Sequence, residues 1–407
     1  MTDPLPGTRG PFGAVTLAAA AAVTPAVTPA VAPAVAPAVA PAVAPAVAPA
    51  VAVAPSPVAP PAVLLVRLPN PAGDVVMATP TLRALRRALP STRILWAGKP
   101  SSLALLDGLA ERDDVVPIEG PMARGILAPM RLGRSWRAMG VDAVLLLKDS
   151  FGAGWSAAAS KAAVRVGYVR HGRGGFLTHR VETPRGADGK RVPEPMTVRF
   201  HRLAAVFGAV PDGLGPRLEV SGAGDGKARM RLVRQRVHGG YFVVSPGAAF
   251  GPSKVYPPAL LGAAAREVRA RTGLLPMVLC APGEEDLARE TAAAIGEPCV
   301  STHDDVARWP EAKALLRGAE VLIGPDAGPR HVAVALGTPV VTILGPTDPG
   351  WTRGDEAMAT VVRREDLSCL GCHLRACPIG HPCMRTLDPM LVARAAIAWV
   401  ERGRPTV

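Results

Sequence analysis

Three short stretches, each placed directly after an apolar run, hold residues that could do chemistry. The first is LPNPAGDVVMATP, residues 68–80, in which Gly73 allows a tight turn and Asp74 stands at the start of a predicted helix. Asp74 could cap that helix, which is a common structural role. It could equally act as a general base that the helix dipole helps to keep ionised at neutral pH. The spacing alone leaves both interpretations open.

The second stretch is SPGAAFGPSKVYP, residues 245–257, which is rich in Pro and Gly and lies between a predicted strand and a predicted helix. Its glycines would let backbone N–H groups approach an anion closely. Lys254, near the start of the following helix, would add a point charge. The pattern favours a phosphate cradle, although it does not match a Walker loop.

The third stretch is PDAGPRH, residues 325–331, which follows the apolar run VLI. Pro329 is well placed at the beginning of a helix, where its missing N–H costs nothing. The free N–H groups of that first turn would then lie beside His331, which could also be an ordinary, satisfied histidine. Three loops suited to anions in one chain favour a diphosphate site.

Four cysteines fall within fifteen residues near the C-terminus, with the spacing C-x2-C-x4-C-x5-C. Such a set could close a tetrahedral zinc site, or it could be reduced thiols in a packed loop, or contain a redox-labile pair. The four candidate ligands are Cys369, Cys372, Cys377 and Cys383. We expect the two other cysteines, Cys280 and Cys299, to be small core residues.

The elements that must position these residues alternate between apolar strands and amphipathic helices from residue 63 onward. Predicted strands at 63–68, 93–98, 142–148 and 164–168 form one set, and the alternation restarts with a strand at 241–245. Such alternation predicts parallel, doubly wound sheets, so we expect an α/β chain with two Rossmann-like units. Ligands bind at the carboxyl ends of the strands in such sheets, which is where all three stretches lie.

We expect four segments along the chain. Residues 1–62 form a low-complexity arm rich in Ala, Pro and Val, whose prolines favour a disordered or polyproline-like tether that is dispensable. Residues 63–222 and 223–386 are the two Rossmann-like domains, and the Gly-rich stretch at 222–227 is predicted to be a linker. The second domain contains the Cys-rich segment 369–383. Residues 387–407 provide a last helix that we expect to pack back on the first domain.

Composition narrows the choice of partner. The formal net charge of +13 favours anionic ligands such as phosphates or an acidic membrane face, although an Arg-rich GC-biased coding sequence would produce the same charge. Aromatic residues make up only 4% of the chain, which argues against a platform for single-stranded nucleic acid. No apolar run approaches the ~18 residues of a membrane span.

Taken together, these stretches resemble the ADP-heptose:lipopolysaccharide heptosyltransferase family, especially its heptosyltransferase II branch. The resemblance extends from about Val63 to the C-terminus. It rests on the Gly-Asp at 73–74, PGAAFGPSK (246–254), the residues of 326–331, GTPVV (337–341), GPTDP (345–349), the basic stretch 149–177 and the cysteine segment 369–384.

The resemblance implies a GT-B fold and an inverting glycosyltransferase that moves heptose from ADP-heptose to the lipopolysaccharide inner core. Asp74 would be the base that deprotonates the acceptor. The implied donor-binding residues are Ser245, Gly247, Lys254, Glu284 (or its neighbour Glu285), Asp326, Gly328, His331 and Thr347. The implied acceptor-binding residues are Asn70, Arg170 and Arg173.

The same resemblance implies that the enzyme requires no cofactor, that its acceptor is lipopolysaccharide (the lipid A-core), and that it does not bind nucleic acid. It also implies a cytoplasmic protein that acts at the cytoplasmic face of the inner membrane, in peripheral contact with anionic lipid. The absence of an Asp-x-Asp pair fits a metal-independent transferase, with structural zinc as a separate candidate. Two motifs differ from those of the family. The family's Asn-Asp-Ser-Gly is Pro-Asp-Ala-Gly at 325–328, and its Lys-x-Trp-Pro is Lys-Val-Tyr-Pro at 254–257. These differences leave open which sugar is transferred. The alternatives are a transferase for another nucleotide-sugar or glycan acceptor, a nucleotide-sugar epimerase of the same fold, and a non-enzymatic zinc or nucleic-acid-binding protein.

Overall fold

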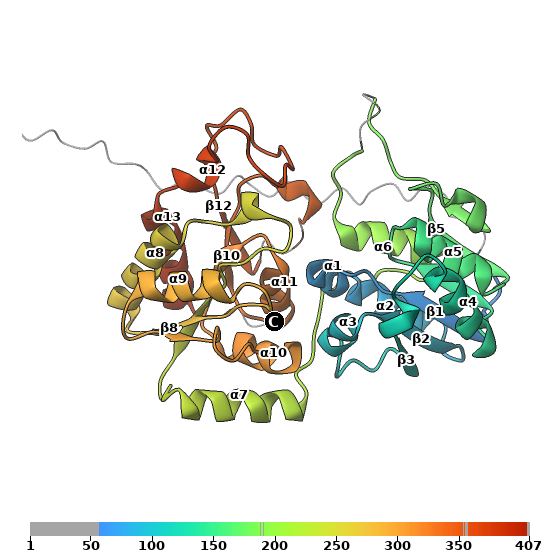
Figure 1. The fold of residues 1–407 in the computed structure, drawn as a ribbon, viewed down its shortest axis with the longest axis horizontal. Coiled ribbons are helices and arrows are strands. Elements are labelled where there is room, and N and C mark those ends of the chain that lie inside the picture. Colours follow the sequence, from blue (N-terminus) through green and yellow to red (C-terminus); the bar gives the residue numbers. More distant parts are fainter. Residues whose placement is uncertain (1–56, 188, 190, 353, 355–356, 405–407) are drawn as a thin grey trace, which may run out of the picture. The chain divides into compact units, whose positions relative to one another are not determined.

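The structure is a computed structural model that describes residues 57–187, 189, 191–352, 354 and 357–404. This part of the chain contains two parallel six-stranded sheets with helices around them (Figure 1). Most of the predicted N-terminal arm lies outside the described residues. Its end does not: the Val58 N–H donates to the Val206 carbonyl at 3.0 Å, and the Thr92 hydroxyl donates to the Pro61 carbonyl at 2.7 Å. Residues 57–62 are therefore bound to the first half of the chain, because these bonds satisfy backbone groups that proline-rich sequence cannot pair internally.

The first sheet has the strand order β3-β2-β1-β4-β5-β6, and all its strands are parallel. Its inner strands are short runs of buried aliphatic residues, as expected where helices cover both faces. In the register, Leu65 lies opposite Leu95 on one side and Val144 on the other. The strands are β1 (Val63–Arg67), β2 (Arg93–Gly98), β3 (Asp114–Pro117), β4 (Ala143–Leu146), β5 (Val164–Tyr168) and β6 (His179–Val181).

The helices of this half include a break that the sequence pattern did not predict. The expected helix over 74–90 is two helices that meet at Ala78, because Pro80 near the start of the second helix has no N–H to continue the first. The helices are α1 (Ala72–Met77), α2 (Thr79–Ala88), α3 (Pro100–Leu105), α4 (Ala128–Ala138), α5 (Phe151–Ala159) and α6 (Met196–Ala204), with 3-10 turns η1 (Gly120–Met122), η2 (Gly174–Phe176) and η3 (Ala205–Phe207).

The second sheet has the order β12-β11-β10-β7-β8-β9 and is also entirely parallel. Its strands are β7 (Tyr241–Val244), β8 (Leu275–Val278), β9 (Val300–Ser301), β10 (Leu322–Pro325), β11 (Val340–Ile343) and β12 (Ala359–Val362). Its helices are α7 (Gly222–Arg234), α8 (Pro258–Thr272), α9 (Glu285–Ile295), α10 (Trp309–Gly318), α11 (Gly328–Ala335), α12 (Pro382–Arg385) and α13 (Pro389–Arg402), with 3-10 turns η4 (Pro252–Lys254) and η5 (Pro349–Trp351). The predicted α/β architecture with two doubly wound sheets is confirmed.

Each sheet has one place where the strand order reverses, and this place determines where a ligand can bind. In the first sheet it lies between β1 and β4, and in the second between β7 and β10. Loops leaving the carboxyl ends of such a strand pair diverge to opposite faces and open a crevice. Asp74 follows β1, Lys254 follows β7, and Asp326 follows β10, so the candidate residues stand at these two points.

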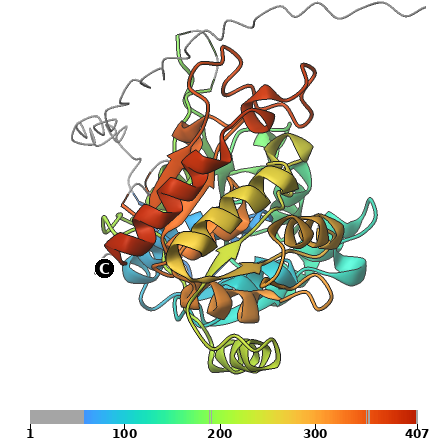
Figure 2. The same ribbon diagram turned by 90° about the vertical axis from the view of Figure 1, so that its left-hand side faces the viewer.

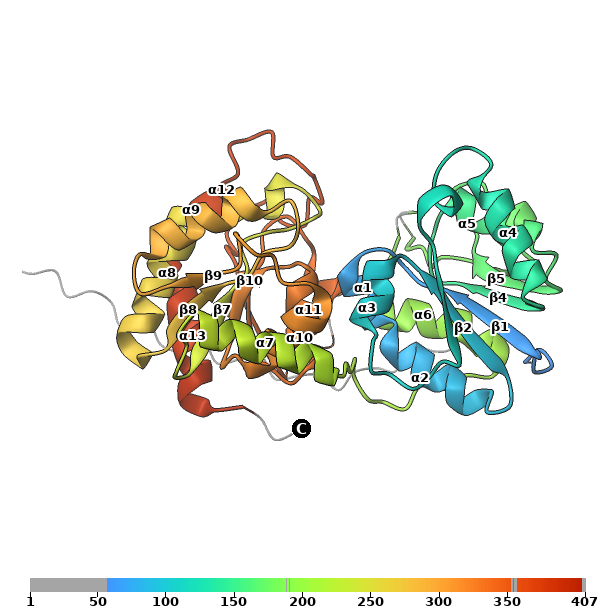
Figure 3. The same cartoon turned by 60° about the horizontal axis from the view of Figure 1, so that its bottom comes forward.

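Two predictions about the ends of the second half are wrong. Residues 222–227 are not a linker, because α7 begins at Gly222 and the Ser221 hydroxyl accepts from the Gly224 N–H at 3.4 Å. A Cβ atom at Gly224 would lie 2.2 Å from the Pro310 carbonyl oxygen, so glycine is required there by the close packing of α7 on α10 (Figure 3).

The last helix, α13, does not pack back on the first half. Its buried residues, which include Val392, Ala396 and Trp399, belong to the hydrophobic core of the second sheet. It lies beside α8 (Figure 2), where its apolar face completes the cover of β10 and β11. No helix among the described residues is long and apolar enough to cross a membrane.

Candidate functional site

Asp74 lies in the first turn of α1, but it is not the helix cap. The N-cap position is Pro71, so the structural interpretation of Asp74 as a capping residue is wrong. Within the described part of the chain, no group donates a hydrogen bond to the Asp74 carboxylate. Burial raises the pKa of Asp74 to about 6, with further influence from the charges of Arg199 and Asp149. A carboxylate of this kind is ionised at neutral pH and still basic enough to accept a proton.

The helix that carries Asp74 packs tightly against α11 of the second sheet. A Cβ atom at Gly73 would lie 2.6 Å from Cδ2 of His331, and one at Gly328 would lie 3.0 Å from the Ala72 Cβ. Two glycines therefore let the first turns of α1 and α11 approach each other. The candidate base is thereby brought to the N-terminus of α11, where free backbone N–H groups favour an anion.

Lys254 and Asp326 form a buried ion pair beside this helix terminus. The Lys254 ammonium donates to Oδ2 of Asp326 at 2.7 Å and to its backbone carbonyl at 2.9 Å. Arg330 occupies the other carboxylate oxygen, with Nη1 donating to Oδ1 at 2.8 Å. Burial alone would raise the pKa of Asp326, but the charges of Lys254 and Arg330 outweigh it and bring the pKa to about 2. The three side chains together carry one net positive charge.

Arg330 is a site residue that the sequence did not reveal. It is buried, and its Nη1 also donates to the Thr352 hydroxyl at 3.2 Å. The available signal was its place in the first turn of α11, directly after the loop that carries Asp326.

His331 is almost completely buried beside the same cluster. Burial and the neighbouring Arg330 lower the pKa of His331 to about 4, although Asp326 lies 3.9 Å from its Nε2. The imidazole is therefore neutral at pH 7. His331 can offer a hydrogen bond to a ligand, but it cannot supply positive charge.

The remaining predicted donor residues lie on adjacent loops at the carboxyl edge of the second sheet. A Cβ atom at Gly247 would lie 2.0 Å from the Glu284 carboxyl carbon, so only glycine fits against that side chain. Glu284 accepts from the Ala281 N–H at 3.0 Å, and burial raises the pKa of Glu284. Ser245 is buried at the end of β7, and Thr347 is nearly buried after β11. Of the two adjacent glutamates, Glu284 is the one against the Gly247 loop.

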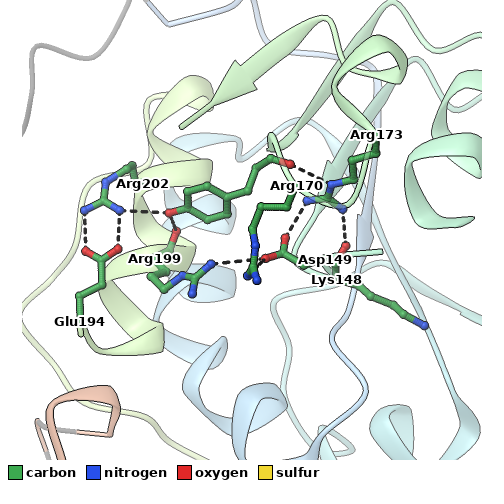
Figure 4. A network of polar contacts seen from close by, with 8 residues as sticks. Lys148, Asp149, Arg170, Arg173, Glu194, Arg199 and Arg202 are labelled. Carbon is green, nitrogen blue, oxygen red and sulfur yellow. Dashed lines mark hydrogen bonds and ion pairs between the residues drawn. The ribbon is translucent and has the colours of Figure 1, made fainter. Parts of the chain in front are cut away.

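On the first sheet, Arg170 and Arg173 surround one carboxylate, that of Asp149 (Figure 4). Arg173 is fully buried, and its three nitrogens donate to the Tyr168 carbonyl, the Lys148 carbonyl and Asp149. Each of its three nitrogens has a partner inside the protein, so Arg173 supports Asp149, and its binding of the acceptor stays a prediction. Asn70 lies in the loop between β1 and α1, and its buried Oδ1 has no partner among the residues that the structure describes.

The zinc prediction is not supported. Four cysteines border one small cavity of about 250 Å³, yet no three His, Cys, Asp or Glu side chains in the described ranges are close enough to hold a metal ion. All six cysteines are free, and Cys280 is buried in the core as expected. The cysteine segment supports the donor loop instead: His381 Nε2 donates to the Ser253 carbonyl at 2.5 Å, and the Ser253 hydroxyl donates to the Leu374 carbonyl at 2.5 Å.

Residues 129–382, more than half of the chain, match the family described as glycosyltransferase family 9 (heptosyltransferase). The chain belongs to glycosyltransferase family 9. It is therefore a glycosyltransferase, and the family resemblance seen in the sequence is confirmed.

Individual family 9 proteins are distant in sequence and similar in fold. Lipopolysaccharide heptosyltransferase 2 of Salmonella typhimurium is 24% identical over 313 residues, which cover 74% of this chain and 87% of that protein. A family 9 glycosyltransferase of Veillonella parvula superposes with a TM-score of 0.70 at 17% identity, over 84% of this chain and 98% of that one. Escherichia coli ADP-heptose lps heptosyltransferase II superposes with a TM-score of 0.68 at 22% identity, over 83% of this chain and 98% of that one. These likenesses confirm the predicted GT-B fold of the family 9 chain.

Proposed function

We propose that this family 9 enzyme transfers heptose from ADP-heptose to the lipopolysaccharide inner core with inversion. In this proposal, residues 63–222 bind the acceptor and residues 223–386 bind the donor. The observation that supports it most is the contact between Gly73 and His331, because this contact brings the helix that carries Asp74 against the first turn of α11. The names of its relatives, which include ADP-heptose and lipopolysaccharide, support the choice of substrates.

The donor side is suited to stabilising a departing diphosphate. As the bond between the sugar and ADP breaks, its electron pair moves onto the diphosphate oxygen, and negative charge grows there. The N-terminus of α11 and the net positive charge of the Lys254, Asp326 and Arg330 cluster would meet this charge. Neutral His331 would contribute a hydrogen bond, and Glu284 would face the nucleotide ribose from the loop after β8.

The acceptor side supplies the base. The acceptor hydroxyl oxygen forms the new bond to the anomeric carbon from the face opposite ADP, and its proton passes to the Asp74 carboxylate. One bond forms, one breaks, and ADP carries away the electron pair, so the configuration inverts. A pKa of about 6 keeps Asp74 mostly ionised at neutral pH, which lets it accept the proton directly.

A direct assay separates this proposal from its alternatives. The enzyme is incubated with ADP-heptose and a lipopolysaccharide that lacks the inner-core heptose, and ADP release and the mass and anomeric configuration of the product are measured. We expect one added heptose with inverted configuration. Transfer from UDP-sugars but not ADP-heptose would instead show another transferase, and isomerisation of the donor without acceptor would show an epimerase. Peripheral contact with the cytoplasmic face of the inner membrane stays a prediction.

A further inference from the structure

The cysteine segment, residues 369–384, contacts both loops of the proposed donor site. Its first part holds the loop after β11. There the His373 N–H donates to the Pro346 carbonyl at 2.9 Å, and the Asp348 N–H donates to His373 Nε2 at 3.4 Å. Thr347, one of the predicted donor residues, lies between these two contacts. A shift at His373 would therefore also shift this loop.

The next residues of the segment hold the loop after β7. The Ser253 N–H donates to the Arg375 carbonyl at 3.2 Å, and the Ser253 hydroxyl donates to the Leu374 carbonyl. A Cβ atom at Gly251 would lie 2.9 Å from the Arg375 carbonyl oxygen, so the two backbones are in close contact. Lys254 directly follows Ser253. The position of its ammonium therefore depends on the cysteine segment.

The backbone of the segment is strained at two histidines. The angle φ is +54° at His373 and +62° at His381, in the left-handed region that few residues other than glycine adopt. Such a conformation costs free energy and persists only where contacts hold it. His373 contacts the loop after β11, and His381 Nε2 donates to the Ser253 carbonyl. The segment and the two donor loops are thus coupled, since each holds the other.

The four thiols that border the cavity in this segment differ in how accessible they are. Cys383 is buried, and burial together with the other three thiols raises its pKa to about 11. The Cys377 sulfur accepts from the His381 N–H at 3.3 Å. Cys372 is exposed and Cys369 is partly exposed. A reagent in solution can therefore reach Cys372 first, with Cys369 beside it in the chain.

Cys369 and Cys372 are separated by a tight turn. Residues 368–371 form this turn, and Gly371 has a φ of +70° that favours glycine. Both cysteines border the same cavity. Two thiols in a C-x2-C arrangement are a common redox-active pair. All six cysteines are free in this structure, so the contacts with the donor loops are those of the reduced protein.

We propose that Cys369 and Cys372 are a modification site, at which a disulfide forms reversibly and loosens the two donor loops. The proposal rests on the proposed function, because it concerns the regulation of the donor site named there. Joining the two sulfurs requires the turn before His373 to change shape. The contacts of His373, Leu374 and Arg375 with the donor loops would then be weakened.

The oxidant is a small disulfide such as oxidised glutathione. The Cys372 thiolate attacks one of its sulfurs, the glutathione S–S bond breaks, and one glutathione thiol leaves. The Cys369 thiolate then attacks the Cys372 sulfur and releases the second glutathione thiol. The two protein thiols lose two electrons and two protons, and the glutathione disulfide gains them. Reduced glutathione in excess reverses both steps.

The first test identifies the bond. The full chain is equilibrated with oxidised glutathione, free thiols are blocked, and peptides are mapped by mass spectrometry. We expect a disulfide between Cys369 and Cys372, which reduced glutathione removes. No bond, a different pairing, or a metal ion bound stoichiometrically by these thiols in the purified protein would overturn the proposal.

The second test measures the donor loops without any ligand. Amide hydrogen exchange of residues 250–254 and 346–351 should be roughly threefold faster, or more, in the oxidised protein, because local opening exposes their N–H groups. Cys372→Ser should remove this difference between oxidising and reducing buffers. Cys299→Ser, a matched change outside the segment, should keep it. Should Cys372→Ser fail to fold, Cys369→Ser takes its place. Equal exchange rates in the oxidised and reduced parent would contradict the proposal.

The third test measures nucleotide affinity by titration with ADP. Oxidation should weaken ADP binding about tenfold, the effect of losing one or two hydrogen bonds, and a reducing agent should restore it. Cys372→Ser should bind ADP equally in both buffers. Equal ADP affinity of the oxidised and reduced parent would contradict the proposal. If the bond forms and the loops loosen, but the reduced protein does not bind ADP, the proposed function is wrong while the control of these loops by the thiol pair stands.

Discussion

Gly73 and His331 are in such close contact that a Cβ atom at Gly73 would lie 2.6 Å from Cδ2 of the imidazole ring. We expect Gly73→Ala to destabilise the protein by about 1–3 kcal/mol, because the added methyl group would have to displace a buried ring. Alanine's better helix propensity, roughly 1 kcal/mol, would offset only part of this cost. The free energy of unfolding in denaturant measures the effect.

The control for this substitution is a double-mutant cycle with His331→Ala. In that background Gly73→Ala should cost less than 0.5 kcal/mol, roughly the limit of independent sites, because the ring that the methyl group displaces is gone. An equal cost in both backgrounds would show that the contact with His331 is not what requires glycine.

Asp74 should make the enzyme less stable as the pH rises. Its pKa is about 6 in the folded chain and close to the ordinary value of 3.8 in the unfolded one. Between pH 4 and 6 the unfolded chain releases this proton and the folded chain retains it, so stability falls across that window. Asp74→Asn should therefore be more stable than the parent at pH 7, by at most about 3 kcal/mol, and equally stable below pH 4. Melting temperatures at both pH values test this, and a constant difference would contradict it.

Lys254→Met should weaken ADP-heptose binding at least tenfold, since it removes the ammonium that we propose binds the diphosphate. It should also destabilise the protein by about 1–3 kcal/mol, because buried Asp326 would keep only Arg330 as a charged partner. Titration with ADP-heptose measures the first effect and thermal unfolding the second. Lys227→Met, at an exposed position of α7, serves as the matched control and should change neither. Parent-like affinity in Lys254→Met would exclude the lysine from the donor site.

The thiols should react in an order set by burial. Cys372 is exposed, whereas Cys383 is buried and its pKa is raised to about 11 by burial and by the neighbouring thiols. Because the thiolate is the reactive form, an alkylating reagent should modify Cys372 first and Cys383 only on unfolding. Mass spectrometry of partly alkylated protein shows the order, and Cys372→Ser should lose the fast phase. Rapid labelling of Cys383 in the folded chain would be the opposite result.

The interior of both sheets was predictable because buried parallel strands are continuous apolar runs. VLLVR and RILWAG, at the centre of the first sheet, are examples. The edge strands of the first sheet were not predicted, since β3 buries only one of its four residues and β6 buries none fully. A strand with so little buried surface has no periodic signal that distinguishes it from a loop.

The sequence predicted those residues of the candidate site that lie close in the chain to the end of a strand. Asp326 directly follows β10, and Asp74 and Lys254 lie just beyond the loops that follow β1 and β7, so the rule for carboxyl ends located them. Arg199 could not be found in this way, because its partner Asp149 is fifty residues away in the chain. Asp149 itself directly follows a predicted strand, so the same rule would have pointed to it. Side-chain pairing across such distances is decided by the tertiary fold.

We propose that Asp74 takes the acceptor proton at a site where other residues already bind the donor. The direct measurement compares heptose transfer and ADP-heptose affinity in the parent enzyme and in Asp74→Asn, which keeps the size of the side chain and removes its basicity. We predict a loss of roughly 10²- to 10⁴-fold in kcat, the usual contribution of a general base, with the dissociation constant changed less than about threefold. Turnover close to that of the parent, or a loss accounted for by weaker donor binding, would contradict the claim.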